Sequence, residues 1–137
     1  MRTKIAILLV AMAVVAVALA AGGSGPGSTG KTTKVTGYVL DSACAYTKNL
    51  DKPISADCAK KCAAAGSPLV ILTKDGNVYL PIDGATPSSG QNAKLLPFAG
   101  QRVTATGTVY ERAGSKAIVI EKIVAEKTSA AKTGAAK

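Results

Sequence analysis

The sequence contains no histidine and no tryptophan, one phenylalanine, and three cysteines in 137 residues. Without histidine, the chain cannot form a Ser-His-Asp triad or use imidazole as a general base or a metal ligand. The carboxylates Asp41, Asp75 and Asp83 fall at expected turns, where aspartate usually has a structural role. We therefore expect no enzyme activity and no catalytic residues, with metal or redox chemistry limited to the thiols and nearby oxygen ligands.

The N-terminus has the three-part pattern of a secretory signal peptide. Arg2 and Lys4 precede an unbroken apolar run from Ile5 to Ala21, which ends in small residues. This pattern predicts a signal peptide over residues 1–21, with cleavage after Ala20 or Ala21. The alternative is an uncleaved anchor, because the run is just long enough to span a bilayer. With cleavage, we expect a periplasmic or secreted protein without stable membrane insertion.

Flexible, basic segments flank the expected domain. Residues 22–34 form a Gly/Ser/Thr-rich linker, and residues 127–137 form a basic tail that we expect to be disordered. The net charge of +9 falls mainly on the ends, since residues 35–126 hold ten basic and eight acidic side chains. Residues 25–32 match the phosphate-binding pattern G-x4-G-K-[ST], but the strand before it and the helix after it are missing. We therefore exclude a P-loop.

Residues 35–126 are predicted to form one mainly β domain. Ser55 as N-cap and Gly66 after the last turn predict a helix over residues 56–65, and one or two helical turns are expected over 92–99. Asp75-Gly76 predicts a two-residue hairpin turn. Gly107 suits a strand that bends at a barrel corner. Alternating or continuous apolar patterns predict five strands, over residues 35–40, 69–73, 77–82, 101–111 and 116–125.

Five strands with a short helix between the third and fourth follow the order of a small OB-like barrel. The helix between strands 1 and 2 is an insertion, and a small open α+β sheet is the alternative. Such barrels also bind nucleic acids, and Tyr79 is the one plausible stacking residue on strands 2–3. The near-neutral domain of an exported chain argues against nucleic acid as a partner.

Several motifs along the sequence resemble an uncharacterised family of small exported bacterial OB-like domains with a D-x-x-C … C-x3-C pattern. The motifs are Gly37-Tyr-Val-Leu-Asp41-Ser-Ala-Cys44, Cys58-x3-Cys62, Gly66-Ser-Pro, Asp75-Gly-Asn-Val-Tyr79, and Leu96-Pro-Phe-Ala-Gly100 through Gly107. The resemblance covers residues 35–125 and implies a fold and an exported location. Members of the family often have a histidine shortly after the first cysteine. This chain has Tyr46-Thr47-Lys48 there, so a Cys/His metal site would lack a ligand.

The three cysteines allow a disulfide, a metal site or thiol exchange. Cys58 and Cys62 are separated by one helical turn, with Cβ atoms about 5–6 Å apart. A relaxed disulfide needs about 3.8 Å. Cys44 is therefore the expected partner of Cys58 or Cys62, in a bond that would close a loop of about 15 residues and add about 3 kcal/mol of stability.

In the second hypothesis, Cys44, Cys58 and Cys62 bind Cu(I), or Zn²⁺ with a fourth ligand such as Asp41 or water. In the third, Cys58 is a redox thiol, since the N-terminus of a helix and neighbouring lysines favour the thiolate. An oxidising compartment favours the disulfide, without a cofactor. We therefore expect an exported binding or interaction module, stapled by a disulfide, for a small ligand or an envelope protein. The alternatives are a thiolate metal-binding protein and a periplasmic thiol redox protein.

Overall fold

A computed structural model of the chain describes residues 29–126. The predicted signal peptide and basic tail, and most of the predicted linker, lie outside these residues. Within them, no helix is long and apolar enough to cross a membrane. The elements along the chain are β1 (Lys31–Asp41), α1 (Ser42–Thr47), α2 (Ala56–Ala64), β2 (Leu69–Thr73), β3 (Val78–Ile82), α3 (Asn92–Leu95), the 3₁₀ turn η1 (Leu96–Phe98), β4 (Arg102–Arg112) and β5 (Ser115–Ala125).

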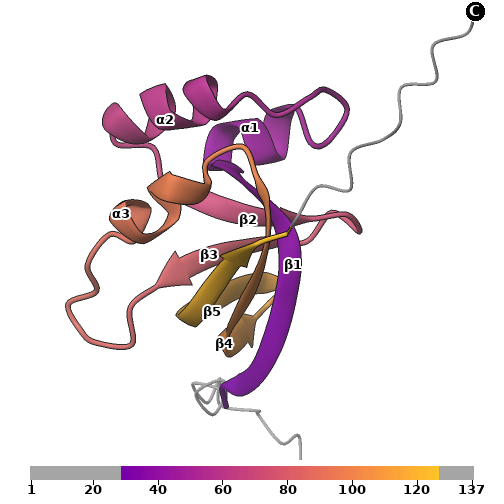
Figure 1. The fold of residues 1–137 in the computed structure, drawn as a ribbon. Helices are drawn as coiled ribbons and strands as arrows, with labels where there is room; N and C mark the ends of the chain where they lie inside the picture. Colours follow the sequence, from indigo (N-terminus) through magenta and orange to yellow (C-terminus); the bar gives the residue numbers. More distant parts are fainter. Residues whose placement is uncertain (1–28, 127–137) are drawn as a thin grey trace, which may run out of the picture.

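The five strands form a closed barrel in the order β1-β2-β3-β5-β4, which confirms the predicted OB-like fold (Figure 1). All neighbouring strands are antiparallel except β3 and β5, whose parallel pairing closes the barrel. β4 bends where expected, because its register with β5 shifts between Thr106 and Gly107. A side chain at Gly107 would lie 2.0 Å from the carbonyl oxygen of Val119, so only glycine fits at this bend.

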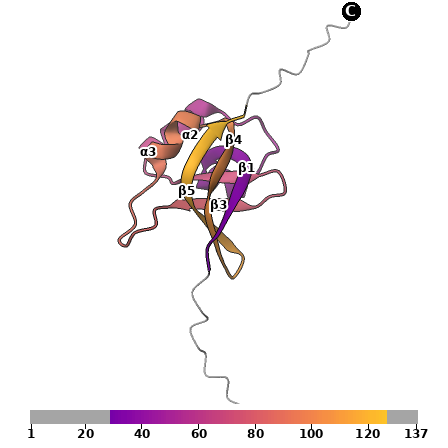
Figure 2. The same ribbon diagram turned by 60° about the horizontal axis from the view of Figure 1, so that its bottom comes forward.

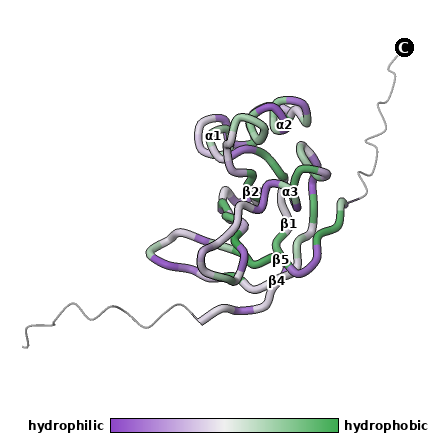
Figure 3. The backbone as a smooth tube through the Cα atoms, turned by 90° about the vertical axis from the view of Figure 1, so that its left-hand side faces the viewer, coloured by the Kyte–Doolittle hydropathy of each residue, from purple (hydrophilic) through white to green (hydrophobic). Residues whose placement is uncertain are grey.

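The main core fills the barrel and is built from small aliphatic residues. Leu69, Ile71, Val103 and Ile118 are among its most deeply buried members. Ala59 of α2 and Leu95 of α3 join this cluster, so the two helices pack over the barrel interior (Figures 1 and 2). Hydrophobic residues are concentrated along the strands that enclose the core (Figure 3).

A second, smaller cluster covers the outer face of β1 and β2. Leu40, Val70 and Leu72 pack there against Ala45 of α1, with Ile54 and Cys44 at the edge. β2 is therefore buried on both faces, one toward the barrel interior and the other beneath α1 and the segment that follows it. This explains why Leu69–Thr73 is a continuous apolar run rather than an alternating one.

Three local predictions need correction. β1 begins at Lys31, so residues 31–34 belong to a strand that pairs with β4 rather than to the linker. The segment from Cys44 onward, predicted as loop, begins with the helix α1, so the insertion holds two helices. The β2–β3 turn has three residues, 74–76, between the hydrogen-bonded Thr73 and Asn77, with Gly76 at a φ of 83°. This is the longer hairpin that ends in a left-handed glycine.

Candidate functional site

The site begins where β1 ends. Asp41 is the last residue of β1 and the N-cap of α1, where its Oδ1 accepts a hydrogen bond from the Cys44 backbone N–H at 3.1 Å. This bond satisfies one of the free N–H groups at the start of the helix. The pairing of Asp41 with Leu69 holds the strand end in place, and Asp41 is only 2% exposed. The fold therefore holds a carboxylate almost entirely out of solvent.

α2 presents the other two thiols. Ser55 caps this helix by accepting a hydrogen bond from the Cys58 N–H at 3.2 Å. The cap starts the helix so that Cys58 lies in the first turn and Cys62 one turn later, on the same side. Cys58 is exposed and Cys62 is half-buried. Ala59, between them, is buried in the barrel core and fixes the rotation of the helix.

Asp41 brings the two halves of the insertion together. Its carboxylate lies close enough to the thiols of Cys44 on α1 and Cys62 on α2 to raise the pKa of both. Cys58 also raises the pKa of Cys62. The structure thus brings the three cysteines and Asp41, the residues singled out in the sequence, into one electrostatically coupled group.

This group favours protonated thiols. Hydrogen bonding to Asp41, together with burial, raises the pKa of Cys44 to about 11. Burial and the Asp41 carboxylate also raise the pKa of Cys62. Burial raises the pKa of Asp41 itself, but the hydrogen bonds from Cys44 and Cys62 outweigh it, so that this pKa lies below its ordinary value. At neutral pH the site therefore holds an ionised carboxylate beside two neutral thiols.

All three cysteines are free thiols in the structure. The predicted disulfide between Cys44 and Cys58 or Cys62 is thus not formed in it, and it stays a prediction for the oxidised protein. Over residues 29–126, no group of three or more His, Cys, Asp or Glu side chains is arranged to hold a metal ion. Binding of Cu(I) or Zn²⁺ by Cys44, Cys58 and Cys62 would require these side chains to move, and it also stays a prediction.

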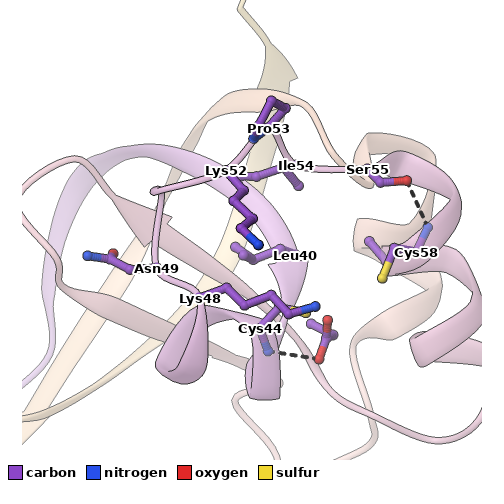
Figure 4. Close-up of a pocket in the computed structure, with 11 residues that line it drawn as sticks. Leu40, Cys44, Lys48, Asn49, Lys52, Pro53, Ile54, Ser55 and Cys58 are labelled. Carbon is purple, nitrogen blue, oxygen red and sulfur yellow. Dashed lines mark hydrogen bonds between the residues drawn. The ribbon is translucent and has the colours of Figure 1, made fainter.

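A pocket of about 140 Å³ lies between α1 and the start of α2, over the outer end of β1. Cys44 and Cys58 face it from opposite sides, and the side chains of Lys48 and Lys52 extend across it (Figure 4). Leu40, Pro53, Ile54 and Ala59 give it apolar walls. The role of the two lysines was not predicted from the sequence. Their only signal there was a pair of cations four residues apart in the segment between Cys44 and Cys58.

The other residues considered from the sequence lie away from this pocket. Tyr79 is half-buried and packs against the barrel core, which limits its use for stacking bases. Asp75 is hydrogen-bonded to the Asn77 side chain, and Asp83 accepts bonds from the N–H groups of Ala85 and Ser89. Both carboxylates therefore stabilise their own turns, as aspartate commonly does.

Comparison with known proteins adds no relative from which a function could be transferred. The chain matches no protein-family model, no curated protein and no solved structure. Its function therefore has to be inferred from the geometry of Asp41, the three thiols and the pocket beside them.

Proposed function

We propose that this protein is a small exported binding module whose ligand occupies the pocket between α1 and α2, and that Cys44 and Cys58 pair to staple that site. The observation that supports this best is that both sulfurs face one pocket from different helices (Figure 4). Cys62 does not line the pocket, which makes it the remaining free thiol.

A staple at this position has a clear physical purpose. The barrel core contains no tryptophan and few aromatic residues, so it buries a modest apolar area. The loop between α1 and α2 is largely exposed from Tyr46 to Pro53, so few buried contacts hold it in place. A Cys44–Cys58 bond would fasten this loop and keep the pocket walls in position, as expected for a binding site in an oxidising compartment.

Thiol exchange is the second candidate, and the exposure of Cys58 favours it. Cys58 lies in the first turn of α2, where a disulfide-containing molecule can reach it, and Cys44 lies across the same pocket to complete the exchange. In this candidate the Cys44–Cys58 bond forms and breaks during function. In the first candidate it is permanent. The two therefore differ in how easily the bond is reduced.

Peptide mapping of the exported full-length protein tests the pairing. Trypsin separates the three cysteines, because it yields the peptides 35–48 with Cys44, 49–60 with Cys58 and 62–74 with Cys62. Alkylation before reduction should label only Cys62, and peptides 35–48 and 49–60 should be found linked. A link between 35–48 and 62–74 would contradict this pairing. Three labelled thiols together with a bound metal in the native mass spectrum would support the metal site instead.

A titration in glutathione redox buffers then separates the two candidates. A permanent staple should resist reduction at potentials where an exchange disulfide opens, since structural disulfides have reduction potentials below about −300 mV. A Cys62→Ser variant is the matched control for both measurements, because it removes the remaining thiol and should leave the Cys44–Cys58 link intact.

A further inference from the structure

The pocket combines two sulfurs with two positive charges. Lys48 follows the end of α1 and Lys52 lies four residues later, and both side chains reach over the space between Cys44 and Cys58 (Figure 4). Over the described residues, neither ammonium group forms an ion pair. Asp41, the acidic residue that lines the pocket, is buried, and its carboxylate already accepts a hydrogen bond from the Cys44 N–H. The lysines are therefore available to an anion from outside.

The pocket is small, about 140 Å³, and open to solvent, so it can hold a short chain whose other end extends outward. Apolar walls formed by Leu40, Pro53 and Ile54 suit a short carbon chain. A molecule with a few methylene groups, a terminal carboxylate and a sulfur atom would match the walls, the lysines and the cysteines at once.

We propose that this pocket captures a small anionic thiol compound as a mixed disulfide on Cys58, with Lys48 and Lys52 binding its carboxylate. The inference rests on the thiol-exchange candidate of the proposed function, because it uses the same pocket and needs Cys58 as a reactive thiol rather than as part of a permanent bond. Cys58 is the point of attachment because it is the exposed cysteine of the three.

The chemistry needs only a small disulfide from the surroundings. The Cys58 thiolate attacks one sulfur of a disulfide RS–SR, forms Cys58–S–S–R and releases RS⁻, which takes up a proton from solvent. The Cys44 thiol can then lose its proton to solvent and attack the Cys58 sulfur. This second step forms the Cys44–Cys58 disulfide and releases the second RS⁻. Overall, one RS–SR is reduced to two RSH while two protein thiols are oxidised to one disulfide.

A series of probes of different charge tests the role of the lysines. The reduced full-length Cys44→Ser variant, in which the second step cannot occur, is mixed with dithiodipropionate, hydroxyethyl disulfide or cystamine, which are anionic, neutral and cationic. We expect dithiodipropionate to modify peptide 49–60 about tenfold faster than hydroxyethyl disulfide, with cystamine slowest, because two cations raise the local concentration of anions. Equal rates for the three probes, or modification mainly on peptide 62–74, would overturn the proposal.

Two double variants distinguish the effect of the pocket lysines on the rate from the effect of positive charge elsewhere near Cys58. Adding Lys48→Gln and Lys52→Gln should bring the anionic rate down to the neutral rate, and adding Lys60→Gln and Lys61→Gln beside Cys58 on α2 should leave most of the preference. These substitutions remove the tryptic sites that bound peptide 49–60, so fragment-ion spectra of the longer peptides locate the modification at Cys58 or Cys62. If both double variants lost the preference for the anionic probe equally, the proposal would be overturned, since the loss would indicate nonspecific attraction to positive charge. Capture on Cys58 in this series, without a Cys44–Cys58 link in the wild-type protein, would contradict the proposed staple and leave the capture proposal standing.

Discussion

The carboxylate of Asp41 accepts a hydrogen bond from the backbone N–H of Cys44 at 3.1 Å and also raises the pKa of the Cys44 thiol. The bond starts α1 at the end of β1. The same carboxylate raises the pKa of Cys62 on α2. Asp41 thus influences β1, α1 and α2 together, and its loss should affect both stability and the thiols.

Replacing Asp41 by alanine should lower the free energy of unfolding of the reduced protein by about 1–3 kcal/mol, because the cap of α1 is lost and the Cys44 N–H loses its partner. Asp41→Asn should cost less, since the amide oxygen can still accept from the Cys44 N–H. Urea denaturation under reducing conditions measures both effects. The exposed Asp51 is the control, and Asp51→Ala should change the stability by less than about 0.5 kcal/mol. Equal losses at positions 41 and 51 would contradict this role for Asp41.

The raised pKa of Cys44 predicts a loss of stability at alkaline pH. Folding raises this pKa from 9.0 to about 11, so the folded state binds the proton more tightly than the unfolded state. The stabilising effect is complete below pH 9 and is lost as the pH rises through about 11. In urea denaturation of the reduced protein over this range, the wild type should lose more stability than Cys44→Ser, which keeps a donor that does not titrate. Parallel pH profiles would contradict the hydrogen bond.

The barrel could be predicted from the sequence because its strands have clear apolar patterns. The run Leu69–Thr73 and the alternation from Val103 onward predict strands within a residue or two of the observed bounds. The start of β1 could not be predicted, since residues 31–34 are polar and join the sheet by backbone pairing with β4. α1 could not be predicted either, because six residues are too few to show helical periodicity. Its one signal was the capping aspartate, Asp41.

The residues of the candidate site could be predicted from the sequence, but their arrangement relative to one another could not. The spacing of Cys58 and Cys62 correctly placed them on one side of a helix. The sequence could not show that Asp41 raises the pKa of thiols on both helices, because this depends on how α2 folds back over the end of β1. The position of Lys48 and Lys52 over the pocket was hidden for the same reason: it depends on the path of an irregular segment between two helices.

The bend of the barrel gives a test that is independent of the cysteines. Gly107→Ala should lower the free energy of unfolding by about 1–3 kcal/mol or more, because the new methyl group would collide with the backbone of Val119. Gly90→Ala is the matched control, since no atom lies within 4 Å of the position that its Cβ would take and its φ is ordinary. Thermal or urea unfolding measures both, and a Gly107→Ala protein as stable as Gly90→Ala would contradict the close approach of β4 and β5.

Stability measured with and without reductant tests the staple itself. A Cys44–Cys58 bond closes a loop of about 15 residues, so the oxidised wild type should exceed the reduced protein by about 3 kcal/mol in free energy of unfolding. Cys62→Ser should keep this difference, because its thiol is outside the bond. Cys58→Ser should abolish it, since α2 then offers only Cys62, which does not line the pocket that Cys44 faces. If Cys58→Ser retained the difference and Cys62→Ser lost it, the staple would be assigned to Cys44 and Cys62, and the pocket would keep both its exposed thiol and its lysines.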